Sequence, residues 1–174
     1  FPIIPWKSNH APREIESVNV YKKNLISFLT GLSNEIKKIT TIKSYDFNNL
    51  NYVTKAIRSN VKGIQIKKFK KLSGRGFEEA NSKKLIIETF NSTGFLELLS
   101  MNSPVILITN KEIFNIKKEY ERYYRKLFEY KIIFFDVKDA ANHVNLNLHR
   151  IEKWWLEKSR QQAISFFCQN MCKY

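Results

Sequence analysis

Residues 85–109 constrain the fold of this chain more than any other stretch. The stretch opens with an apolar, β-branched run at 85–89 and closes with a second apolar run at 105–108. Between them, the sequence NSTG at 91–94 offers three residue types that favour a helix N-cap, and leucines with Phe95 then recur at helical spacing. Two buried strands joined through a helix form a right-handed βαβ unit, so the stretch predicts a parallel sheet.

The rest of the chain repeats this alternation of helices and strands. Residues 1–17 hold three of the four prolines, and we expect them to form an extended lead-in before a single domain at 18–174. The pattern predicts an α/β fold, an open parallel Rossmann-like sheet of about five strands with helices on both faces. Apolar periodicity predicts strands at 40–45, 64–69, 85–89, 105–108 and 132–135. It predicts helices at 18–38, 50–59, 77–82, 111–129, from 136 or 139 to 144, at 148–156 and at 159–171.

The NSTG segment falls at the edge where such a sheet binds ligands, outside the carboxyl ends of its strands. A helix start there presents unpaired backbone N–H groups and a positive dipole end, which suit a phosphate. Glu97 follows one turn later, where a carboxylate could accept both hydroxyls of a ribose. The alternative, an ordinary N-cap followed by an exposed glutamate, stays open.

Basic residues also lie near the expected ligand edge. Lys67, Lys68 and Arg75 flank the third strand and could meet a diphosphate, or could simply be solvated. The formal net charge of the whole chain is +14, which favours an anionic partner such as nucleic acid, a membrane surface or phosphorylated substrates. The cations are spread along the chain rather than gathered in one stripe, so a dedicated nucleic-acid face is not favoured.

Other residues carry less functional signal. Cys168 and Cys172 have no histidine nearby and predict free, partly buried thiols, not a zinc site. His143 is expected to be a surface or capping histidine, and the tryptophan pair at 154–155 to pack in the core. We find no catalytic triad, P-loop, paired carboxylates or metal-ligand cluster. No run spans a membrane and no signal peptide opens the chain, so a cytoplasmic location is expected.

Several segments together resemble the C-terminal part of the LIC12162-type transferases of bacterial surface-polysaccharide and O-antigen gene clusters. These are FNSTGFLELLSMNSPVIL, the helix after it, YKIIFFDVKDAANHVN, and IEKWW followed by SRQQAISFFCQNM. The resemblance covers residues 64–174 well and 18–45 loosely. The stretch also looks like the donor-binding half of GT-B glycosyltransferases, in which a turn and helix hold the nucleotide phosphates.

The resemblance implies a nucleotide-sugar donor as substrate, no separate cofactor or metal, and a polysaccharide or lipid-linked glycan as acceptor. It assigns Asn91, Ser92, Thr93 and Gly94 to the donor phosphates and Glu97 to the nucleotide-sugar moiety. Gly94 stands where a second threonine is more frequent, which removes one hydroxyl. The acceptor site and the catalytic base are expected in an N-terminal half that this sequence does not contain, and the chain begins with Phe rather than Met.

Three functional hypotheses follow. The first is a glycosyltransferase donor-binding domain that acts on a bacterial surface polysaccharide, with peripheral contact to an anionic inner membrane. The second is a non-enzymatic basic module that binds nucleic acid or an anionic membrane. The third is a sugar-nucleotide epimerase, which shares the GT-B architecture. The donor sugar, the nucleotide base and the catalytic base are not assigned by any motif.

Overall fold

The chain forms two compact units, each with its own parallel sheet. The computed structural model describes residues 11–44, 51–68, 83–89, 93–111, 114 and 116–172. Unit 1 comprises Phe1–Lys71 with Val137–Asn145, and unit 2 comprises Leu72–Asp136 with Leu146–Tyr174. The expected α/β fold with parallel strands is confirmed. The described strands do not form the expected single sheet of five, however, but one sheet of two strands and one of three.

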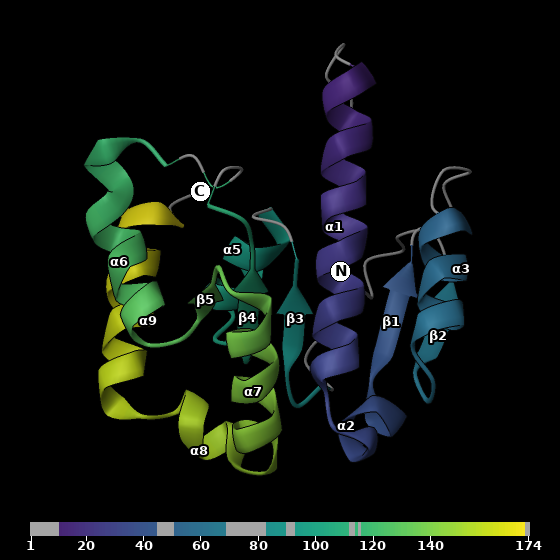
Figure 1. The fold of residues 1–174 in the computed structure, drawn as a ribbon. Coiled ribbons are helices and arrows are strands. Elements are labelled where there is room, and N and C mark those ends of the chain that lie inside the picture. Colours follow the sequence, from purple (N-terminus) through teal and green to yellow (C-terminus); the bar gives the residue numbers. More distant parts are fainter. Residues whose placement is uncertain are drawn as a thin grey trace. The chain divides into compact units, whose positions relative to one another are not determined.

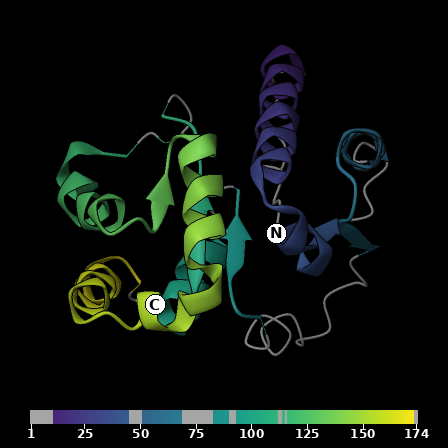
Figure 2. The same ribbon diagram turned by 60° about the horizontal axis from the view of Figure 1, so that its bottom comes forward.

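Unit 1 consists of a long helix, a short helix and a small βαβ unit (Figure 1). Figure 2, which views α3 nearly along its axis, shows this helix beside the two strands. The sheet pairs Thr41 with Gln65 at one end and Ser44 with Lys68 at the other. The elements are α1 (Ala11–Gly31), α2 (Asn34–Ile39), β1 (Thr41–Ser44), α3 (Asn51–Asn60), β2 (Gln65–Lys68) and most of α7 (Val137–Asn147).

Two boundaries in unit 1 differ from the expectation. Helix α1 begins at Ala11 instead of residue 18, because Pro12 lies in its first turn, where the missing N–H group costs nothing. The single helix expected at 18–38 is broken after Gly31. The Ser33 hydroxyl accepts the Ile36 N–H at 3.3 Å and starts α2. Asn145 of α7 fixes the break, since it accepts from the Ser33 N–H and donates to the Gly31 carbonyl, each at 2.9 Å.

The separation into two sheets has a local reason in β2. Gln65 and Lys67 are exposed and Ile66 is half-buried, so one face of this strand lies in solvent. The inner strands of a doubly wound sheet are apolar on both faces. The alternation in β2 is therefore typical of an edge strand, which ends a sheet rather than continuing it.

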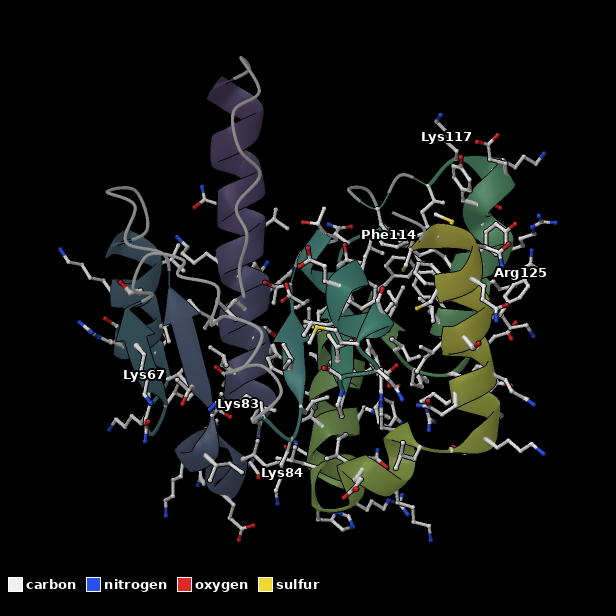
Figure 3. All side chains as sticks on the ribbon, turned by 180° about the vertical axis from the view of Figure 1, so that it is seen from behind. Lys67, Lys83, Lys84, Phe114, Lys117 and Arg125 are labelled. Carbon is white, nitrogen blue, oxygen red and sulfur yellow. The ribbon has the colours of Figure 1, made fainter. Side chains whose placement is uncertain are left out.

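Unit 2 contains the predicted βαβ unit, and this prediction is confirmed. Strand β3 runs parallel to β4, with Ile86 opposite Val105, and β4 lies between β3 and β5. Seen from behind, α5 lies in front of this sheet, and α9 lies beside α6 (Figure 3). The elements are β3 (Ile86–Glu88), α5 (Thr93–Ser100), β4 (Val105–Ile108), η1 (Lys118–Tyr120), α6 (Glu121–Glu129), β5 (Ile133–Phe134), η2 (Leu148–Arg150), α8 (Ile151–Trp155) and α9 (Lys158–Met171).

The long helix expected at 111–129 is wrong in its first half. In the described part of this stretch only η1 and α6 are helical, and the longest of the described helices is α1. The cause is Phe114, whose buried ring packs edge-on against Tyr124, Phe128 and Phe135 at centroid distances of 5.3–5.7 Å. Phe114 therefore lies in the core at a position where a continuous helix was expected. The helix expected at 77–82 lies outside the described residues.

The C-terminal helices are held by buried polar contacts as well as by apolar packing. Trp155 donates its indole N–H to the backbone carbonyl and the side-chain oxygen of Asn102, both at 2.9 Å. Arg160 is buried and donates to the carbonyls of Tyr130 and Trp154. Its guanidinium also lies 4.2 Å from the Trp154 ring centroid. The predicted packing role of the tryptophan pair is confirmed. Within the described residues, no helix is long and apolar enough to cross a membrane.

Candidate functional site

The carboxyl ends of three parallel strands in unit 2 define the candidate site. Strands β3, β4 and β5 run in the same direction, so the residues that follow each strand lie along one edge. Open parallel sheets bind ligands at this edge. The polar residues that end or follow the strands there are Glu88, Thr89, Thr109, Asn110, Lys111 and Asp136.

Three of the six predicted donor-binding residues lie in the described part of the chain. Thr93 is the first residue of α5 and is exposed, and Gly94 follows it. Glu97 lies one turn further along the helix and is half-buried. Helix α5 follows β3 directly in sequence, so its amino end belongs to the carboxyl side of that strand. Asn91, Ser92 and Arg75 lie outside the described residues, and their roles stay predictions.

Glu88 is a candidate that the sequence reading missed. It is the last residue of β3, stands opposite Leu107 in the ladder, and is only 1% exposed. Burial raises the pKa of this carboxyl above its ordinary value of 4.5, because the low-dielectric interior disfavours the charged form. A buried acid with a raised pKa at a ligand edge is a frequent feature of functional sites. A glutamate inside the apolar run 85–89, directly before a turn, was the available signal.

Thr89 places a second polar group beside Glu88. Its hydroxyl oxygen is buried and makes no hydrogen bond with any residue that the structure describes. Buried hydroxyl groups usually find a partner, because leaving one unsatisfied costs about 1–3 kcal/mol. A carboxyl thus ends β3 and a hydroxyl follows it, one residue before the NSTG segment.

A lysine supplies positive charge at the same edge. Lys111 follows β4 and is exposed, and its ammonium lies 5.6 Å from the ring centroid of Phe135, which follows β5. The Phe135 ring also stacks on Phe128 at 4.5 Å. The aromatic ring thus positions a cation next to the carboxyl ends of two strands, although the sequence reading had assigned Lys111 only to a helix.

The other residues considered from the sequence lie on other elements. His143 is half-buried on α7, His149 is exposed in η2, and Lys67 extends from β2 into solvent (Figure 3). Cys168 and Cys172 are free, half-buried thiols, as predicted. Burial and the neighbouring Cys172 raise the pKa of Cys168 to about 12, so it is a poor nucleophile at neutral pH. In the described ranges, no group of three acidic, histidine or cysteine side chains could hold a metal ion.

Comparison with known families adds one positive result. The model of a family described as LIC12162 family transferase matches residues 4–173, nearly the whole chain. The match includes both units and the whole of the candidate site. No curated protein and no solved structure matches the chain.

Proposed function

The chain belongs to the LIC12162 family of transferases, and on this basis we propose that it transfers a sugar from a nucleotide-sugar donor to a bacterial surface polysaccharide. The carboxyl edge of unit 2 would bind the donor, in the manner of the C-terminal half of a GT-B glycosyltransferase. The observation that carries the proposal is the parallel β3–α5–β4 unit, in which α5 opens at the ligand edge of the sheet.

The donor diphosphate would lie at the amino end of α5. The first N–H groups of a helix have no partner within the helix and carry partial positive charge, so they bind anions. The exposed Thr93 hydroxyl adds a donor, and Asn91 and Ser92 would add two more. Gly94 carries no side chain, which allows the backbone to approach a phosphate closely. Lys111, and Arg75 as predicted, would complete the positive charge.

Glu97 would bind the ribose of the donor. A helical residue three or four positions after the phosphate-binding turn lies one turn further along the same face. Its half-buried carboxylate could accept hydrogen bonds from two adjacent hydroxyls. Glu97 would then distinguish a nucleotide from a free phosphate.

The proposed chemistry stabilises a leaving group. The bond between the anomeric carbon and the diphosphate oxygen breaks, and a bond from that carbon to an acceptor hydroxyl oxygen forms. Negative charge develops on the nucleoside diphosphate, where the N–H groups of α5 and the Lys111 ammonium would stabilise it. The hydroxyl proton would pass to a base supplied with the acceptor site, which we propose lies in a preceding domain. The acceptor would be a polysaccharide or a lipid-linked glycan.

A second function, a binding module for an anionic polymer or membrane, is favoured by the net charge of +14. This alternative predicts binding that depends on charge alone. Tight, salt-tolerant binding of random-sequence DNA without any effect of nucleotides would favour it over sugar transfer. We expect instead weak DNA binding that falls steeply as salt is added.

The first test is nucleotide binding by calorimetry and thermal unfolding. Nucleoside diphosphates should raise the melting temperature of the wild type, because a ligand of the folded state stabilises it. Thr93→Ala should weaken binding by about 1.5–3 kcal/mol, the value of a hydrogen bond to a charged group. Gly94→Val should weaken binding more, because a branched side chain would block the phosphate, and Glu97→Gln should weaken it without unfolding the protein.

The matched control is Ser33→Ala, which removes the helix cap of α2 in unit 1. It should lower stability by about 1 kcal/mol and leave nucleotide affinity unchanged. If the three α5 variants likewise lose stability but keep wild-type affinity, NSTG is only a helix cap. The donor-site assignment would then be wrong.

A further inference from the structure

The most exposed large apolar side chain in the described residues is Ile39, at 70% exposure. It is the last residue of α2 and follows two lysines, Lys37 and Lys38. The chain then enters β1 through Thr40. The Thr40 N–H donates to the Lys37 carbonyl at 3.2 Å, and its hydroxyl donates to the Ile36 carbonyl at 2.7 Å. This closed helix end fixes Ile39 at the surface.

A third lysine belongs to the same surface, which we call the Ile39 surface: Lys37, Lys38, Ile39 and Lys62. The Gln65 N–H donates to the Thr40 carbonyl at 3.1 Å, so β2 enters the sheet beside the end of α2. A Cβ atom at Gly63 would lie 3.8 Å from the Cβ of Lys37. The turn that carries Lys62 therefore packs against the last turn of α2, at the amino end of the two-stranded sheet (Figure 1).

Among the described side chains of unit 1, cations outnumber acids around the Ile39 surface. Lys38 and Lys62 are exposed, and Lys37 donates to the Thr30 carbonyl at 2.9 Å. The nearest acidic residue along the chain is Glu35, in the first turn of α2. Among the described side chains of unit 1, the acids are Glu35 and Asp139, whereas the exposed cations are Lys23, Lys38, Lys55, Arg58, Lys62, Lys67 and Lys138.

We infer that the Ile39 surface docks on an anionic lipid bilayer. Ile39 would enter the boundary between headgroups and acyl chains, and Lys38 and Lys62 would lie at the lipid phosphates. A protruding aliphatic side chain gains free energy by leaving water for a membrane, but it forms no hydrogen bond or stacking contact with a nucleic acid. The inference does not depend on the proposed sugar transfer.

Unit 2 contains a second exposed aliphatic side chain between lysines, which serves as a control. Leu156 is 55% exposed at the end of α8 and is flanked by Lys153 and Lys158, so it shares the composition of the Ile39 surface. Its immediate neighbours also include two exposed carboxylates, Glu152 and Glu157. Leu156 has two exposed acids within four residues and Ile39 has one, Glu35, so the Leu156 surface should be attracted to anionic lipid less strongly.

The test is co-sedimentation of the full chain with phosphatidylcholine vesicles that contain or lack phosphatidylserine. We expect binding only to the phosphatidylserine vesicles, with a steep loss as salt rises. Ile39→Ser and the double change Lys38→Gln with Lys62→Gln should each lower the bound fraction several-fold. Leu156→Ser and the double change Lys153→Gln with Lys158→Gln should bind like the wild type. Circular dichroism confirms that each variant is folded.

Three outcomes would overturn the inference. One is equal binding to vesicles without phosphatidylserine, and another is an equal loss in the Leu156 set. The third is wild-type vesicle binding by Ile39→Ser together with displacement of vesicles by random-sequence duplex DNA. This combination would mean that the lysines bind an anionic polymer rather than lipid. Since none of these measurements involves a nucleotide, failure here is distinct from failure of the donor site.

Discussion

The two sheets of this protein are both parallel, yet they differ in how far their strands are buried. Every residue of β4 in unit 2 is buried, and the strand lies between two neighbours. In β2 of unit 1, exposed polar residues alternate with a half-buried isoleucine. The same βαβ connectivity thus builds a sheet with a fully buried central strand in unit 2 and a half-exposed two-stranded sheet in unit 1. The exposed face of β2, rather than the order of the elements, distinguishes this strand from the inner strands of a doubly wound sheet.

The units differ equally in how they treat charge. Unit 2 contains the ion pairs Lys126–Glu129 at 3.2 Å and Arg160–Glu157 at 2.9 Å. In unit 1, the exposed lysines of α2, α3 and β2 have few described acids near them. We therefore expect unit 1 to contribute more than unit 2 to the attraction of the protein to anionic surfaces.

The largest expected effect concerns the buried strand. Leu107→Ala in β4 should lower the free energy of unfolding by about 2–5 kcal/mol, because it leaves a cavity in a fully buried site. Ile66→Ala in β2 should lower it by about 1 kcal/mol, since that side chain is only half-buried. Urea denaturation of both variants measures the difference. Equal losses would mean that the two sheets are buried to the same extent.

The second prediction compares the polar contacts that tie helices together. Arg160→Met in unit 2 should cost about 3 kcal/mol, because the Tyr130 and Trp154 carbonyls would lose their buried donor and Glu157 its partner. Asn145→Ala in unit 1 should cost about 1–2 kcal/mol, since it removes two neutral hydrogen bonds at the α1–α2 break.

Urea unfolding monitored by tryptophan fluorescence and by circular dichroism separates these two variants. Arg160→Met should alter the fluorescence of the Trp154 region, which the guanidinium contacts. Asn145→Ala should leave that signal unchanged and lower only the helical stability of unit 1. The reverse ranking of the two losses would contradict the view that unit 2 holds the more buried polar contacts.

Local sequence patterns predicted the elements whose causes are local. The βαβ unit at 85–109 was predictable because two apolar runs and a helical pattern lie within one stretch. The break between α1 and α2 depends on Asn145, which is far away in sequence, and the loss of helix before η1 depends on where the Phe114 ring packs. The expectation of a single five-stranded sheet was wrong, because periodicity predicts strands but not which strands pair with one another.

The candidate site was predictable only in part, for a similar reason. Thr93, Gly94 and Glu97 follow a recognisable turn–helix pattern, and the structure describes them on α5. Glu88 and Lys111 gain their importance from burial and from a neighbouring strand. Glu88 was missed because the stretch 85–89 is apolar on average. Lys111 was missed because the pattern over 111–129 predicted a helix there.

The smallest expected effect is a change in the pH dependence of stability, caused by Glu88. Burial raises its pKa in the folded state above the ordinary value of 4.5, so the folded protein binds this proton more tightly than the unfolded chain does. The stabilisation is fully present below pH 4.5 and is lost as pH rises through the folded-state pKa. Glu88→Gln keeps the shape and stays neutral, so its melting temperature should match the wild type in acid and exceed it at neutral pH. Thermal unfolding of the two proteins across this pH range measures the effect. If Glu88→Gln is the less stable protein at neutral pH, the Glu88 carboxyl is charged and paired in the folded state. The ligand edge of unit 2 would then hold a charged group, as the surface of unit 1 does.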